Sequence, residues 1–258
     1  MELEMNKRAW RGMAIFLALG VSSFGVHAEG QKQTVEKKEQ PFAVKLGATR
    51  VIYSPDSGGA TLTVSNPQDY PMLVKSQVIE EDKKTAAPFI VTPPLFRLDG
   101  QQQSRLRIIN TGGGMPSDRE TLQWLCVTGI PPKADDAWAQ DGGGKSKPDH
   151  ATLNVQISVS SCIKLLVRPS NIRGAPTDVA SSLVWTREGG QMKVNNPTPF
   201  YMNLKSVSVG GKDVDKLEYI PPFSSKMFAL PQGASGEISW QMVTDLGGVS
   251  KTYKAELQ

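Results

Sequence analysis

The stretch from 151 to 169, ATLNVQISVSSCIKLLVRP, alternates between apolar and polar side chains with a strict two-residue period. That period predicts one long β-strand with an apolar face. Most strands run ~5 to 6 residues, so this one extends well past the usual length. Two interpretations stay open at this point: a plain core strand whose first half is a hairpin arm, or a strand whose outer half is covered by another molecule. The apolar positions are Leu153, Val155, Ile157, Val159, Ile163, Leu165 and Val167.

Residues 1–28 have the pattern of a secretory signal peptide. Basic residues (Lys7, Arg8 and Arg11) precede an apolar run over 13–21, and Val26-His27-Ala28 offers a small-residue cleavage pattern. We therefore expect export and cleavage after Ala28, with translation starting at either Met1 or Met5. The apolar run is too short to span a bilayer, so no membrane insertion is expected.

The remaining part of the chain, about 230 residues, has room for one large or two ordinary domains. Alternating runs together with 24 Gly and 18 Pro indicate an all-β fold. We expect a flexible N-terminal extension over 29–40, an N-terminal domain over 41–170 and a C-terminal domain over 171–258. The lengthy loop over 133–149 is expected to be functional or mobile. Charges of both signs are interspersed, with 29 Lys+Arg against 25 Asp+Glu, which does not indicate a nucleic-acid partner.

Both cysteines, Cys126 and Cys162, lie in the exported part of the chain. An oxidising compartment favours a disulfide between them, on adjacent antiparallel strands. A metal site is not expected, because His150 is the only histidine after cleavage and there is no Cys-x-x-Cys.

Catalysis is not indicated by the residues either. One histidine in a Gly-rich loop gives almost no support for a Ser-His-Asp or Cys-His arrangement. We expect no enzyme activity and no cofactor.

Lys164 stands on the polar face of the long strand. A lysine there normally faces solvent. The functional alternative places Lys164 in an interdomain cleft with Arg50 from the first strand, where two cations would bind a carboxylate. Periodicity alone favours the solvent-facing interpretation for both residues.

Several segments resemble the periplasmic chaperones of the chaperone-usher pathway, which assemble fimbriae and adhesins. The strongest matches are PSDRETLQWL at 116–125 with Ile130-Pro131-Pro132, and CIKLLVRP at 162–169. Supporting matches are RVIY at 50–53, the segment 66–71, NPTPFY at 196–201 and YIPP at 219–222. The segment PFIVTPPLFRLD at 88–99, the lengthy loop, the charged extension and the cysteine pair resemble the long-loop branch, which serves the F1 capsule and Afa/Dr-type adhesins.

The resemblance implies two immunoglobulin-like β-sandwich domains at an angle, with a cleft between them. It implies that Arg50 and Lys164 anchor the C-terminal carboxylate of a fibre subunit. The donor strand that fills the groove of that subunit is implied to comprise Leu153, Val155, Ile157 and Val159, with Ala151 as an outermost, weaker donor. Val44 and Leu46 match the first strand, which extends alongside the donor strand when a subunit is held.

The function implied is an ATP-independent periplasmic chaperone that delivers fimbrial or adhesin subunits to an outer-membrane usher by donor-strand complementation. For the free chain we expect self-association that buries the donor strands. Two other classes stay open. A fibre subunit would need an apolar N-terminal donor segment, and residues 29–40 are too polar for that. A hydrolase on a β-sandwich is disfavoured by the histidine count.

Overall fold

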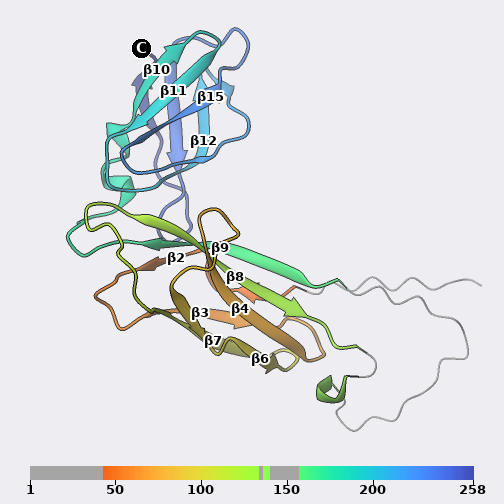
Figure 1. The fold of residues 1–258 in the computed structure, drawn as a ribbon. Coiled ribbons are helices and arrows are strands. Elements are labelled where there is room, and N and C mark those ends of the chain that lie inside the picture. The colour runs from red at the N-terminus through yellow and green to blue at the C-terminus, as the bar shows by residue number, and fades with distance from the viewer. Residues whose placement is uncertain (1–42, 134–135, 140–156) are drawn as a thin grey trace, which may run out of the picture. The chain divides into compact units, whose positions relative to one another are not determined.

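The computed structural model describes residues 43–133, 136–139 and 157–258 (Figure 1). The proposed signal peptide and three of the donor positions, Ala151, Leu153 and Val155, lie outside these residues. The described part is all-β and forms two β-sandwich domains, as expected. Its helical content is three short 3₁₀ turns, Ala137–Ala139, Pro176–Asp178 and Ala180–Ser182. None of its helices is long and apolar enough to cross a membrane.

The first sandwich consists of nine strands in two sheets. One sheet has the order β1-β3-β7-β5 and the other β2-β9-β8-β4-β6. The strands are β1 (Lys45–Leu46), β2 (Arg50–Tyr53), β3 (Ala60–Ser65), β4 (Met72–Glu80), β5 (Phe89–Thr92), β6 (Leu95–Leu98), β7 (Gln103–Asn110), β8 (Thr121–Ile130) and β9 (Val159–Val167).

The segment 88–98 changes sheets at Pro93-Pro94. A proline has no backbone N–H for a sheet ladder, so two in a row interrupt the strand. β5 ends at Thr92 on the edge of one sheet, and β6 begins at Leu95 on the edge of the other. Both strands of this proline-containing segment are therefore edge strands.

The core of the first sandwich lies between its two sheets. In β4 every second residue is buried, with Met72 and Val74 fully enclosed. They pack in one cluster with Leu106 and Ile108 of β7 from the opposite sheet. Burying an aliphatic side chain stabilises a fold by roughly 1.5 to 3 kcal/mol, so this alternation sets which face of each strand points inward.

The second sandwich has its own core. A three-stranded sheet with the order β10-β11-β15 packs against a sheet with the order β13-β12-β16-β17, in which β14 also pairs with β12. Trp185 and Trp240 lie at its centre, with ring centroids 5.5 Å apart. The strands are β10 (Val184–Glu188), β11 (Gln191–Asn196), β12 (Met202–Val209), β13 (Lys212–Asp213), β14 (Tyr219–Ile220), β15 (Ser224–Ala229), β16 (Glu237–Met242) and β17 (Tyr253–Glu256).

β9 is the described part of the long alternating stretch, and it lies between β2 and β8 (Figure 1). Its burial rises along its length: Val159 is 39% exposed, while Leu165 and Val167 are buried in the first core. Near its end the second face is also covered, because Leu166 packs against Leu122 and Tyr201. The strand begins at Val159, and Ile157 precedes it without strand pairing.

Candidate functional site: two cations beside an open strand edge

Arg50 and Lys164 occupy the same rung of a parallel strand pair. β2 pairs with β9 in the register Arg50↔Lys164 and Val51↔Leu165. Side chains alternate along a strand, and Val51 and Leu165 point into the core. Arg50 and Lys164 therefore project together from the opposite face, where both are half-buried. We call these two residues the cation pair.

The Lys164 ammonium is held by neutral groups of the second sandwich. Its Nζ donates to Oδ1 of Asn203 and lies 4.4 Å from the centre of the Tyr219 ring. Burial lowers the pKa of Lys164 to about 8, with the positive charges of Arg50 and Lys83 acting in the same direction. The lysine is thus partly desolvated and next to a second cation.

Arg50 is also incompletely paired. Its Nη1 donates to the backbone oxygen of Val243 at 3.4 Å, while its Nε is buried and has no hydrogen-bond partner among the described residues. Burial lowers the pKa of Arg50, and Asp245 opposes that shift. A buried donor without an acceptor costs about 1 to 3 kcal/mol.

A carboxylate of the chain itself, Glu81, lies close to this site. It accepts hydrogen bonds from Tyr201 Oη at 3.1 Å and Tyr219 Oη at 2.9 Å. Burial raises the pKa of both tyrosines, and the negative charge of Glu81 adds to that shift. Of the groups that shift the pKa of Lys164, Glu81 has the weakest effect, and it raises that pKa. Lys83, two residues after Glu81, has its Nζ 4.3 Å from the centre of the Trp124 ring.

A second charged cluster, around Arg168, lies four residues after Lys164 in the chain. Arg168 donates from Nε to Glu120 Oε1 at 2.7 Å, and Tyr201 N donates to Glu120 Oε2 at 2.7 Å. Burial raises the pKa of Glu120, while Arg168 and these hydrogen bonds act against the rise. Both residues lie in the two segments that carry the strongest family resemblance, but sequence reasoning assigned neither a role.

The edge of β9 that faces away from β8 is only partly paired. β2 covers Lys164–Val167, whereas β8 covers the whole strand. Among the described residues, no strand pairs with this edge over Val159–Ile163. Two of the predicted donor side chains are exposed there, Ile157 at 64% and Val159 at 39%.

The predicted N-terminal contacts, Val44 and Leu46, lie in and beside β1. Val44 is buried in the first core, and Leu46 pairs with Val64 of β3 while packing partly against the same core. The structure therefore places both residues in the sheet opposite β9.

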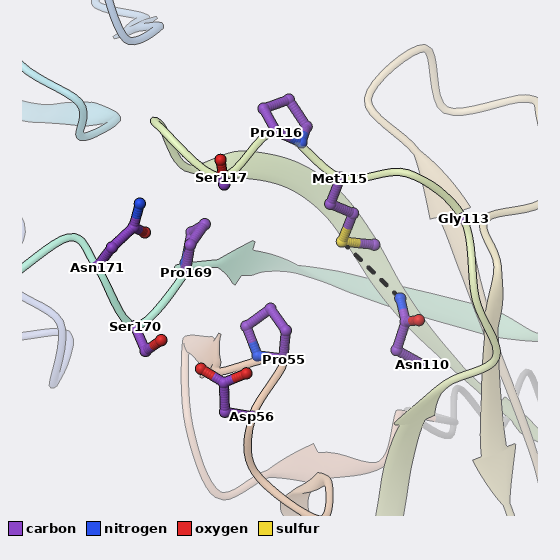
Figure 2. Close-up of a pocket in the computed structure, with 10 residues that line it drawn as sticks. All are labelled: Pro55, Asp56, Asn110, Gly113, Met115, Pro116, Ser117, Pro169, Ser170 and Asn171. Atoms are coloured by element: carbon purple, nitrogen blue, oxygen red, sulfur yellow. Dashed lines mark hydrogen bonds between the residues drawn. The ribbon is translucent and has the colours of Figure 1, made fainter.

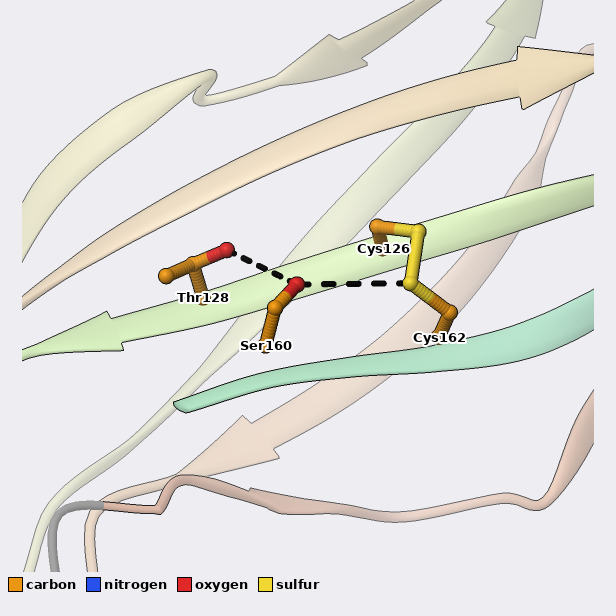
Figure 3. The surroundings of a disulfide bond; sticks show 4 residues. All are labelled: Cys126, Thr128, Ser160 and Cys162. Carbon is orange, nitrogen blue, oxygen red and sulfur yellow. Dashed lines mark hydrogen bonds between the residues drawn. A yellow bond between two sulfur atoms is a disulfide. The ribbon is translucent and has the colours of Figure 1, made fainter. Parts of the chain in front are cut away.

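The cysteines form the expected disulfide. Cys126 of β8 and Cys162 of β9 are directly opposite each other, with an S–S bond of 2.05 Å (Figure 3). Two residues along the ladder, on the same face, Thr128 Oγ1 donates to Ser160 Oγ at 3.0 Å (Figure 3). The bridge joins the two strands just before the cation pair.

A separate hollow of about 360 Å³ lies among the loops after β2, β7 and β9 (Figure 2). Asp56 is the one charged side chain among its ten lining residues, and the nearest polar contact drawn there is Asn110 Nδ2 to Met115 Sδ at 3.8 Å. An acid and a base do not meet in it. Within the described residues there is also no group of three His, Cys, Asp or Glu that could hold a metal.

Two β-sandwich domains, with the cation pair on the first of them, point to the class of two-domain assembly chaperones. The family profile described as "Pili and flagellar-assembly chaperone, PapD N-terminal domain" matches residues 43–173, and "Pili assembly chaperone PapD, C-terminal domain" matches residues 178–254. The chain belongs to this PapD-like family, whose members are periplasmic chaperones of the chaperone-usher pathway and not enzymes.

Individual relatives agree with this assignment. Chaperone protein AfaB of Escherichia coli is 54% identical over 236 residues, which covers 86% of this chain and 96% of AfaB. Chaperone protein caf1M of Yersinia pestis is 42% identical over 245 residues, covering 91% and 95%. The crystal structure of the E. coli chaperone DraB is 57% identical with a TM-score of 0.75, covering 84% of this chain and 97% of DraB.

The chaperone SafB of Salmonella enterica, solved in complex with the SafA pilin, is 51% identical with a TM-score of 0.76. That match covers 85% of this chain and 99% of SafB. The expectation of a PapD-like chaperone is thereby confirmed.

Proposed function

We propose that the chain holds an unfinished fibre subunit, its client, by two adjoining elements. The cation pair binds the C-terminal carboxylate of the client. The alternating stretch before it adds a strand to the client and fills its groove with apolar side chains. The donors are Leu153, Val155, Ile157 and Val159, with Ala151 as the outermost.

The observation that carries this proposal is the continuity of the two elements. Lys164 follows directly on Val159–Ile163, the part of β9 whose outer edge is unpaired among the described residues. An added strand would gain backbone hydrogen bonds along that edge while alternate side chains enter pockets, a mode of recognition already described for chaperone-pilin complexes. A charge bound at Lys164 would set the register, because a shift by one residue turns every side chain to the other face.

The electrostatics support a carboxylate as the ligand. Within the part of the chain that the structure describes, Arg50 Nε is a buried donor without a partner, and Lys164 is desolvated beside a like charge. A carboxylate would accept from both residues, and such charge-assisted hydrogen bonds are about twice as strong as neutral ones.

The likeness to SafB, which was solved with a pilin, supports a pilin or adhesin subunit as the client. We propose that the client is passed to an outer-membrane usher without ATP. The exposed Ile157 supports self-association of the free chain as a way to cover the donor strand. We also propose that Val44 and Leu46 extend the first strand alongside the donor strand when a client is held.

Export follows from the periplasmic family, and cleavage after Ala28 is proposed from the small-residue pattern at 26–28. The division into an extension over 29–40 and domains over 41–170 and 171–258 is likewise a proposal. Sequencing the N-terminus of the exported protein tests the cleavage position, and limited proteolysis tests the domain boundaries.

Co-expression with candidate pilin and adhesin subunits in the periplasm tests the client proposal. Wild type, Lys164→Ala and the control Lys205→Ala, an exposed lysine of β12, are purified and the co-purifying subunit is quantified. We expect a one-to-one complex with wild type and Lys205→Ala, and its loss with Lys164→Ala. A Lys164→Ala protein that holds the client at normal yield would show that the anchor is elsewhere.

A further inference from the structure

We propose that Asn203 of the second sandwich is a positioning residue for the anchor: it holds the Lys164 ammonium in place without neutralising it. This inference rests on the proposed function of the cation pair and names a further residue on which that function depends. Carboxylate binding by a lysine of the first sandwich would then require the second sandwich.

The orientation of the Asn203 amide is set by its second hydrogen bond. Its Nδ2 donates to the backbone oxygen of Tyr201 at 3.2 Å, so Oδ1 is the atom that faces Lys164 Nζ. The reversed amide would point its NH₂ at an ammonium group and its oxygen at a carbonyl oxygen, and both contacts are repulsive. Asn203 is only 4% exposed, so water does not offer an alternative partner easily.

Lys164 Nζ contacts two neutral groups, the Asn203 amide and the Tyr219 ring, and both leave its charge available for a ligand. An ammonium group has three donors, and the amide oxygen uses one of them. The Tyr219 ring, 4.4 Å from Nζ, attracts the cation through its π face. Neither contact removes the positive charge, so donors and charge remain for an incoming carboxylate.

The charged groups around Lys164 are Arg50 on β2, and Lys83 and Glu81 after β4. Glu81 is the one acid among them, and it is engaged by the hydroxyl groups of Tyr201 and Tyr219. It forms no ion pair with Lys164 within 4 Å among the described residues. A carboxylate in place of the Asn203 amide would change this by placing a negative charge in direct contact with Nζ.

Two near-isosteric variants separate positioning from a merely structural role. Asn203→Asp keeps an acceptor at Lys164 but adds a charge, so the pKa of Lys164 should rise. Asn203→Leu removes the acceptor, so that pKa should fall further below its wild-type value of about 8. The control is Asn195→Asp, the same change at an exposed asparagine of β11. The pKa is read directly by NMR titration of the lysine side-chain signals.

Binding is measured with a synthetic peptide of alternating Val and Thr, about eight residues long, prepared with a free C-terminal carboxylate and as the C-terminal amide. The ratio of the two affinities measures the contribution of the C-terminal carboxylate to binding. That carboxylate stays ionised throughout pH 6 to 10, so a change of the ratio over this range reports a titration of the protein. In wild type we expect the free acid to bind about tenfold better near pH 7. We expect that ratio to fall as the pH rises through about 8.

In Asn203→Asp the ratio should be smaller at pH 7 and its decline should move to higher pH. In Asn203→Leu the decline should move to lower pH. An unchanged Lys164 titration and an unchanged profile in both folded variants would overturn the inference. If Asn203→Leu fails to fold, Asn203→Ser takes its place, since its shorter side chain also withdraws the acceptor.

The variant Lys164→Ala separates the proposed role of Asn203 from the proposed carboxylate anchor on which that role depends. If Lys164→Ala leaves the acid-to-amide ratio at its wild-type value, the carboxylate anchor itself is wrong. If Lys164→Ala abolishes the ratio while the Asn203 variants keep the wild-type profile, the anchor stands and only the role of Asn203 is refuted.

Discussion

Arg168 and Asp245 join the two sandwiches through a bidentate ion pair: Arg168 Nη1 and Nη2 donate to Oδ2 and Oδ1 of Asp245 at 2.8 and 3.0 Å. The same guanidinium bonds Glu120, whose side chain is fully buried. Arg168 therefore connects the end of β9 with the loop after β16. Lys164 of the cation pair lies on β9, four residues before Arg168 in the chain, so this ion pair helps to hold Lys164 beside the second sandwich.

Removing Arg168 should destabilise the protein strongly. Arg168→Ala leaves Glu120 buried without its cation, and breaking a buried pair from one side costs about 3 to 5 kcal/mol. Urea unfolding followed by circular dichroism measures this loss. Arg119→Ala, which breaks an exposed ion pair with Asp118, is the control and should change the stability little. Equal small losses in both variants would contradict a structural role for Arg168.

Replacing Lys164 by Met should stabilise the free protein while abolishing client capture. The folded-state pKa of Lys164 is lowered from 10.5 to about 8, so below pH 8 the folded protein bears the full cost of the buried charge. That cost disappears as the pH rises from about 8 to 10.5, where the folded state has already lost the proton. We expect Lys164→Met to be about 1 to 2 kcal/mol more stable than wild type at pH 7.

The difference between the two proteins should shrink toward pH 10. Urea unfolding of both at pH 7, 8, 9 and 10 provides the measurement. A stability difference that does not vary with pH would mean that Lys164 is not desolvated in the free chain.

A charge on the open edge of β9 should prevent capture without unfolding the chaperone. Ile157 and Val159 are 64% and 39% exposed, so Asp at either position is solvated in the free chain but would enter an apolar groove in the complex. We expect loss of co-purifying client with a wild-type melting temperature. Val184→Asp, at a residue 41% exposed on β10, is the matched control and should leave capture intact. Capture by Ile157→Asp at the wild-type yield would refute the donor assignment.

Removal of the disulfide should lower stability. Cys126 and Cys162 close a long loop, and the chain-entropy account gives about 3 to 4 kcal/mol for a loop of this size. The double variant Cys126→Ala with Cys162→Ala should lose that amount in urea unfolding, and wild type in reductant should lose about the same. A double variant as stable as wild type would show that the ladder between β8 and β9 suffices on its own.

Local chemistry made much of the fold predictable. The two-residue apolar period of 151–169 identified β9, and the two prolines Pro93-Pro94 interrupt the chain between β5 and β6. The cysteine pair predicted the bridge between β8 and β9, and the spacing of short alternating runs predicted the second sandwich. These features depend on side-chain alternation and missing backbone donors, which act between neighbours in the chain.

The candidate site was predictable only in part. Periodicity alone favoured a solvent-facing Lys164, and the resemblance to a family was needed to pair it with Arg50. Asn203, Tyr219 and Glu81 were not predicted as its neighbours. Glu120 and Arg168 lay in recognised motifs, yet no local rule indicates that a carboxylate at 120 meets a guanidinium at 168.

The sequence by itself determined the all-β class and the strand faces, because both follow from residues close along the chain. It also predicted the disulfide, since the exported part of the chain contains only two cysteines. Only the tertiary structure decided the environment of Lys164. Its hydrogen-bond partner Asn203 lies 39 residues away, and its lowered pKa comes from burial and from the charges of Arg50 and Lys83. Desolvation and charge proximity are properties of distance in space, and long-range packing sets that distance.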